Sequence, residues 1–192
     1  MLTLGRVAAI PFLIGAWYWT SPWATAVCTG LFIVAALTDW LDGYLARKMN
    51  LSSAFGAFLD PVADKLMVAA VLILLSTQPI AAGPLAGNMW LVPVLTLATI
   101  GREITMSALR EWAASMGPEA REAVAVNSWG KWKTATQMVS LTLLLLAREG
   151  GSGMFIAEAA TVGCGLLAVS AYLSVHSLGI YFRSLWKFMA PA

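Results

Sequence analysis

Four aspartates lie close together in a chain whose neighbouring segments are almost entirely apolar. Asp39 and Asp42 are three residues apart, and Asp60 and Asp64 are four residues apart. On a helix, each of these spacings places both carboxylates of a pair on one face. A short connection between the two pairs turns the chain back, so the two faces can converge. Charged groups are costly in an apolar environment, and these four carboxylates therefore require a partner.

Divalent metal ions are the partner that the sequence favours, because the nearby cations, Arg47, Lys48 and Lys65, are fewer than the acids. Carboxylate oxygens suit Mg²⁺, Mn²⁺ or Ca²⁺. Four carboxylates can hold two such ions, an arrangement that assists phosphoryl transfer. Gly43 and Gly56 leave space beside the acids for a ligand to approach the backbone. Two alternatives stay open: ion pairs with Arg or Lys across helices, and a path for protons or cations.

The segments that position these acids are predicted to be helices of a membrane protein. Of the 192 residues, 59% are hydrophobic and only 11% are charged, against about 25% charged residues in soluble domains. Several apolar runs reach the roughly 17–25 residues that a transmembrane helix needs, and they do not alternate as membrane β-strands do. We expect an all-α, polytopic protein with a single domain, 1–192. Six transmembrane helices are expected at about 4–20, 22–47, 57–77, 88–115, 130–148 and 153–180.

The basic residues separate to one side when these spans are threaded alternately across a membrane. Arg148 falls on the opposite side. The positive-inside rule makes the basic side cytoplasmic, or its equivalent in an organelle, and the four aspartates lie in the same half of the membrane. The net charge of +2 is too small to indicate a nucleic-acid partner. The basic side holds Arg6, Arg47, Lys48, Lys65, Arg102, Arg110, Arg121, Lys131, Lys133, Arg183 and Lys187.

The acidic stretch resembles the signature of a known enzyme family. The pattern Asp39-x2-Asp42-Gly43-x2-Ala46-Arg47-x8-Gly56-x3-Asp60-x3-Asp64 is similar at every position to that of the CDP-alcohol phosphotransferases. MLTLGRVAAIPF, IGREITMSALREW (100–112) and NSWGKWKTATQMVSLTLLLL (127–146) resemble its phosphatidylglycerophosphate synthase subfamily, in particular the cyanobacterial and plastid members.

This resemblance implies a six-helix membrane enzyme that is usually a homodimer. Such an enzyme transfers the phosphatidyl group of CDP-diacylglycerol to sn-glycerol 3-phosphate and releases CMP. The implied location is a bacterial inner membrane or a plastid or other organelle inner membrane, with the active site on the cytoplasmic or stromal face and with membrane lipid around the helices.

The resemblance also implies a role for each residue of the signature. Asp39, Asp42 and Asp60 would bind two Mg²⁺ or Mn²⁺ ions, and Asp64 would bind one of them and act as the general base. The residues that would line the cytidine-diphosphate site are Asp39, Gly43, Ala46, Arg47 and Gly56.

An acceptor that carries a phosphate requires a second, cationic pocket. Arg102 and Arg110 lie about two turns apart on nearly the same face of the fourth span, and Lys131 and Lys133 open the fifth span on the same side of the membrane. Arginine matches phosphate oxygens in pairs, and lysine adds a point charge. Two alternatives for these four residues stay open: anchoring to anionic lipid, and pairing with the acidic side chains of Glu103 and Glu111.

Three other acceptors and one other class of protein are also considered. The acid cluster does not distinguish glycerol 3-phosphate from inositol phosphate, serine or phosphatidylglycerol, whereas a basic pocket favours a phosphorylated acceptor. A cation transporter or channel could also carry aspartates. However, a transporter typically places paired broken helices near the middle of the membrane, and these acids lie toward one face.

Overall fold

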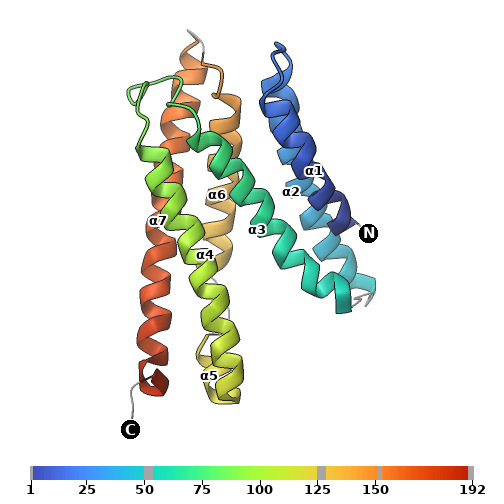
Figure 1. Cartoon of the computed structure of the whole chain (residues 1–192), viewed down its shortest axis with the longest axis vertical. Helices are drawn as coiled ribbons and strands as arrows, with labels where there is room; N and C mark the ends of the chain where they lie inside the picture. Colours follow the sequence, from blue (N-terminus) through green and yellow to red (C-terminus); the bar gives the residue numbers. More distant parts are fainter. Residues whose placement is uncertain (1, 50–53, 125–128, 151–152, 190–192) are drawn as a thin grey trace.

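The computed structural model describes residues 2–49, 54–124, 129–150 and 153–189. Within these ranges the chain is helical, without strands. Figure 1 shows the elements in order. They are α1 (Leu2–Trp17), α2 (Ala24–Met49), α3 (Ala54–Ser76), α4 (Leu91–Met116), α5 (Pro118–Ala123), α6 (Trp129–Leu146) and α7 (Met154–Met189).

The six long helices correspond to the six that the sequence predicts, and two differences have physical reasons. Helix α5 was not predicted, although Pro118 at its first position and Glu119 in its first turn both favour a helix start. Gly117 separates α5 from α4 with a φ of 115°, which favours glycine. Helix α7 continues to Met189, past the predicted end at 180, because glycine and proline are absent from residues 180–189.

The long helices run alternately up and down. In Figure 1 the α1–α2, α3–α4 and α6–α7 connections lie at the upper end of the view, whereas α5 lies at the lower end. Helix α7 packs against α6 and α4, and α1 packs against α2 and α3. Contacts of α3 with α4 and of α2 with α6 join the two groups. This arrangement agrees with the predicted alternate threading.

The hydrophobic core consists of two clusters of buried side chains. The larger cluster, which includes Leu13, Phe32, Leu72 and Leu141, lies between α1, α2, α3, α6, the start of α4 and the first half of α7. The smaller one includes Met106 and lies between α4, α5 and the second half of α7. Between the two clusters along α4 and α7 lie charged or polar side chains, Arg102, Ser170, Ser174 and Ser177, together with apolar ones such as the buried Ala171.

One helix within the described residues is long and apolar enough to cross a membrane by length and composition alone, the segment Met154–Trp186 of α7. The apolar segments Leu4–Trp17 and Ala24–Asp39 are shorter. Charged residues interrupt α3 at Asp60, Asp64 and Lys65, and they interrupt α4 from Arg102 onward. The prediction of six transmembrane spans is therefore not confirmed and stays a prediction.

Many large apolar side chains are nevertheless exposed, and they occur on most of the long helices. Examples are Phe12 on α1, Leu37 on α2, Leu97 and Ile104 on α4, and Tyr172 on α7. Isolated exposed apolar residues are ordinary in soluble proteins, but large apolar patches usually mark an interaction with protein or membrane. The outer surface of the bundle therefore suits an apolar environment.

Helices α6 and α7 approach closely at a glycine. A Cβ atom at Gly163 would lie 3.0 Å from Leu144 Cγ and 3.3 Å from Leu143 Cβ. The close approach also allows Ser140 Oγ of α6 to donate a hydrogen bond of 2.8 Å to the Gly163 carbonyl oxygen. Small residues permit such contacts between apolar helices, where packing and interhelical hydrogen bonds drive association.

Replacing Gly163 with valine is expected to lower the free energy of unfolding by about 1–3 kcal/mol, because the added methyl groups overpack the α6–α7 contact. The matched control is Gly165→Val on the same helix, where a Cβ atom meets nothing within 4 Å. Thermal unfolding in detergent measures both variants. Equal destabilisation of the two would show that helix propensity, and not the close contact, explains the effect.

Candidate active site

Two of the four predicted metal-binding aspartates converge on one arginine. Arg6 of α1 forms ion pairs with Asp39 of α2 and, at 3.5 Å between Nη2 and Oδ1, with Asp60 of α3. The arginine is 4% exposed, whereas the side chains of Asp39 and Asp60 are 43% and 48% exposed. The predicted convergence of the two acidic helices is therefore found at Asp39 and Asp60, and Arg6 supplies a cation that the sequence analysis did not place there.

The structure describes only some of the other residues of the acidic signature. Asp64 lies on α3, one turn after Asp60, within the range of charge–charge interaction with Asp39, Arg6, Glu103 and Lys65. Gly56 lies in the first turn of α3 and is partly buried. The remaining signature residues belong to α2, and their side chains lie outside the described part of the structure: Asp42, Gly43, Ala46 and Arg47.

The carboxylates of Asp39 and Asp60 fit a divalent ion in their chemistry, although both pair with Arg6 in this structure. Asp39 and Asp60 supply hard oxygen ligands from two different helices, and both carboxylates are open to solvent. Among the side chains that the structure describes, no third acidic, histidine or cysteine side chain completes a ligand group with them. Because the guanidinium of Arg6 lies between the two carboxylates, an ion bound by both would replace or share these contacts.

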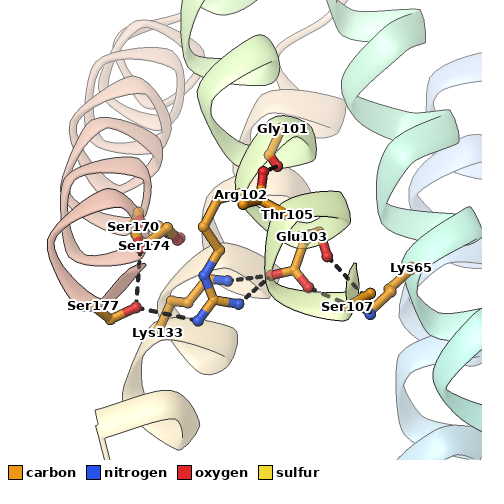
Figure 2. A network of polar contacts seen from close by, with 10 residues as sticks. All are labelled: Lys65, Gly101, Arg102, Glu103, Thr105, Ser107, Lys133, Ser170, Ser174 and Ser177. Carbon is orange, nitrogen blue, oxygen red and sulfur yellow. Dashed lines mark hydrogen bonds and ion pairs between the residues drawn. The ribbon is translucent and has the colours of Figure 1, made fainter. Parts of the chain in front are cut away.

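A second charged cluster joins α3, α4 and α6 (Figure 2). Glu103 Oε1 accepts a hydrogen bond of 3.0 Å from Arg102 Nη1 and forms a short ion pair with Lys133 Nζ. Glu103 Oε2 lies 4.0 Å from Lys65 Nζ. The Lys65 ammonium also donates a hydrogen bond to Ser107 Oγ. We name these four charged residues, Lys65, Arg102, Glu103 and Lys133, the basic cluster.

Helix α7 contributes hydroxyl groups to the same place. Arg102 Nη2 donates a hydrogen bond of 3.2 Å to Ser177 Oγ, and Figure 2 shows Ser170, Ser174 and Ser177 on the face of α7 nearest to Arg102. The sequence analysis did not single out these serines. Their spacing of four and three residues places them on one helical face, and this polar stripe on an apolar helix is the signal that could have found them.

Two of the four residues that were predicted to bind the acceptor phosphate lie close together in the structure. Arg102 and Lys133 come together, but both pair with Glu103, which was one of the alternatives that the sequence left open. Arg110 is exposed and lies eight residues, or about 12 Å, further along α4. Lys131 belongs to α6, and its side chain lies outside the described part of the structure.

Comparison with known proteins identifies a family over most of the chain. Residues 1–175 match the family described as CDP-alcohol phosphatidyltransferase. The chain is 62% identical over 187 residues to CDP-diacylglycerol–glycerol-3-phosphate 3-phosphatidyltransferase 1, chloroplastic/mitochondrial, of Arabidopsis thaliana. It is 41% identical over 184 residues to CDP-diacylglycerol–glycerol-3-phosphate 3-phosphatidyltransferase of Pectobacterium atrosepticum.

A third relative has a different name. The chain is 56% identical over 189 residues to a cardiolipin synthase (CMP-forming) of Oryza sativa. The matches cover 96–98% of this chain, 62% of the Arabidopsis relative, 57% of the rice relative and 92% of the bacterial one. No solved structure matches the chain.

Replacing Arg6 with glutamine is expected to lower the free energy of unfolding of the metal-free protein by about 1 kcal/mol, because two carboxylates lose their shared cation while water screens them in part. Chemical unfolding in detergent with a chelator measures this change. The control is Arg121→Gln, at an exposed arginine of α5, which should leave stability unchanged. Equal stability of the two variants would contradict a stabilising role for the Arg6 pairs.

Proposed function

The chain belongs to the CDP-alcohol phosphatidyltransferase family, and we propose that it transfers the phosphatidyl group of CDP-diacylglycerol to sn-glycerol 3-phosphate, giving phosphatidylglycerophosphate and CMP. The bacterial relative with this activity in its name aligns over 92% of its length. The observation that carries the proposal is the presence, on neighbouring helices, of converging carboxylates and a basic cluster. These are the two kinds of site that a metal-assisted transfer to a phosphorylated acceptor needs.

The proposed donor site lies at the acidic signature. Members of this family generally use divalent metal ions, and we assign their binding to Asp39, Asp42, Asp60 and Asp64. Two Mg²⁺ or Mn²⁺ ions there would neutralise the pyrophosphate oxygens of the donor. The proposed contacts of the cytidine diphosphate are Asp39, Gly43, Ala46, Arg47 and Gly56.

Asp64 is the proposed general base. The 1-hydroxyl oxygen of the acceptor attacks the β-phosphorus, the one that bears diacylglycerol, and the bond from this phosphorus to the bridging oxygen breaks. The bonding electrons leave with CMP, and the hydroxyl proton passes to the Asp64 carboxylate. A base is required because the hydroxyl is far too weak an acid to ionise near neutral pH. The position of Asp64, in electrostatic range of both Asp39 and Glu103, supports a role between the donor and acceptor sites.

The acceptor phosphate is proposed to bind at the basic cluster. Arg102 and Lys133 are largely buried and come from different helices, so together they can hold a phosphate from two directions. Arg110 and Lys131 are proposed as further contacts on the same side of the membrane. A fixed position for the phosphate would orient the 1-hydroxyl toward the donor, which is the main benefit of such a pocket.

The proposed setting is a membrane. The exposed apolar side chains on most of the long helices and the long apolar segment of α7 support it. Six spans would place the acidic signature in the half of the membrane nearest the basic, cytoplasmic or stromal face, where water-soluble acceptor can reach it. The membrane is proposed to be a bacterial inner membrane or an organelle inner membrane, in which the protein forms a homodimer.

A second candidate acceptor is phosphatidylglycerol, which would make the product cardiolipin. The 56% identity to a protein named cardiolipin synthase supports this candidate. The two acceptors differ in charge and in location, because glycerol 3-phosphate is soluble and carries a phosphate dianion, whereas phosphatidylglycerol is a lipid with a phosphodiester. The buried cations of the basic cluster favour the dianion.

One assay tests the proposal. Detergent-solubilised protein is supplied with CDP-diacylglycerol, Mg²⁺ or Mn²⁺, and one acceptor at a time: glycerol 3-phosphate, phosphatidylglycerol, inositol phosphate or serine. We expect CMP release with glycerol 3-phosphate. Release with phosphatidylglycerol alone would assign the second function, and no CMP with any acceptor would exclude both.

Replacing Asp64 with asparagine is expected to reduce CMP release by about 10²–10⁴-fold, because the variant lacks the proton acceptor. Binding of CDP-diacylglycerol, measured by its protection against thermal unfolding, should change little. The comparison variant is Asp60→Asn, which should weaken donor binding as well as turnover. Near-normal turnover of the Asp64 variant would assign the base elsewhere.

A further inference from the structure

Glu103 is the point at which the basic cluster is neutralised. Its carboxylate pairs with Arg102 and Lys133 through one oxygen and faces the Lys65 ammonium with the other. The three cations come from three helices, α4, α6 and α3, and Figure 2 shows them directed at the same carboxylate. A single acidic side chain therefore holds together a set of cations that would otherwise repel one another.

We propose that Glu103 is an internal counter-anion, which holds the cations in place before the acceptor binds and is exchanged for the acceptor phosphate. The inference rests on the acceptor pocket assigned under the proposed function. Glu103 is a positioning residue in this scheme, because it acts through Arg102 and Lys133 and does not touch the reacting atoms.

Burial explains why the cations need a partner at all times. The side chains of Arg102 and Lys133 are only 11% and 8% exposed. Buried charges without an opposite charge are strongly destabilising. Glu103 is 25% exposed and Lys65 is 39% exposed, so the anion lies on the more accessible side of the cluster.

The charge of the cluster and its hydrogen-bond donors favour the exchange of Glu103 for the acceptor phosphate. The three cations together carry a charge of +3, and a phosphate monoester of charge about −1.5 to −2 at neutral pH compensates them better than the single negative charge of the carboxylate. A phosphate also offers three acceptor oxygens where the carboxylate offers two. Among the described residues, Arg102 Nε is buried and has no hydrogen-bond partner. This N–H group is a donor that a phosphate oxygen could use.

The test compares Glu103→Gln with the wild-type protein in detergent, without donor or metal. Thermal unfolding is followed as sn-glycerol 3-phosphate is added, with glycerol as the probe that lacks a phosphate. Without ligand the variant should unfold at a lower temperature than the wild type. With glycerol 3-phosphate its stabilisation should be larger, corresponding to affinity on the order of tenfold higher, as for other coupled binding equilibria. Glycerol should stabilise neither protein.

Two further variants make the outcomes distinguishable. Glu111→Gln, at an exposed acid two turns further along α4, should behave as the wild type. Arg102→Ala should lose the stabilisation by glycerol 3-phosphate, and retention of it would overturn the acceptor pocket itself. If Arg102→Ala loses it but Glu103→Gln binds glycerol 3-phosphate no more tightly than the wild type, the pocket stands and the exchange is overturned. Glu103→Asp, which keeps the charge, should bind glycerol 3-phosphate with an affinity between those of the wild type and Glu103→Gln. If the glutamine variant does not fold, an aspartate variant that binds no more tightly than the wild type overturns the exchange.

Discussion

The compensation of buried charge inside an apolar bundle is the constraint on which the rest of this structure depends. Two groups of like charge lie among helices whose other residues are mainly hydrophobic, and each group is held by one residue of opposite sign. Arg6 lies between Asp39 and Asp60, and Glu103 lies between Arg102 and Lys133. Because the pairs of Arg6 with Asp39 and Asp60 and the pair of Lys133 with Glu103 link different helices, the same contacts that neutralise the charges also fix how these helices meet.

The position of the basic cluster within the core has a consequence for packing. Arg102 of the cluster and the serines of α7 lie between the residues of the two apolar clusters along α4 and α7. A buried polar layer stabilises less than an apolar layer of the same volume, but it restricts the helices to the register in which its groups find their partners. The hydrogen bond from Arg102 to Ser177 therefore relates the site on α4 to a particular register of α7.

The carboxylate of Asp64 lies within range of charge–charge interaction with Asp39 and Arg6 of one charged group and with Glu103 and Lys65 of the other. Under the proposed function, Asp64 would accept the proton of the acceptor hydroxyl, and a base in that role must lie where donor and acceptor meet. The apolar outer surface of the helices suits the lipid part of a CDP-linked donor, while the half-exposed carboxylates of Asp39 and Asp60 suit its water-soluble part. The helices thus present both an apolar and a water-accessible environment.

The amino-acid sequence was sufficient to predict the six long helices and the family of the chain. Glycine and proline positions predicted the breaks, and the helical spacing of the aspartates predicted that α2 and α3 present carboxylates to one another. Arg102 and Lys133 were predicted to share a site because both lie on the basic side. The helices and the face shared by each aspartate pair could be predicted because they depend on local geometry, in which a fixed rise and turn per residue relate spacing to position.

The tertiary structure alone decided which opposite charges meet. Arg6 is 33 residues from Asp39 and 54 from Asp60 in the sequence, Ser177 is 75 residues from Arg102, and Glu103 is 30 residues from Lys133. Pairing over such separations depends on how α1, α6 and α7 pack and rotate about their axes, and helical periodicity does not encode this. The sequence by itself therefore determined which groups could do chemistry, and only helix packing decided which counter-charge holds each of them in place.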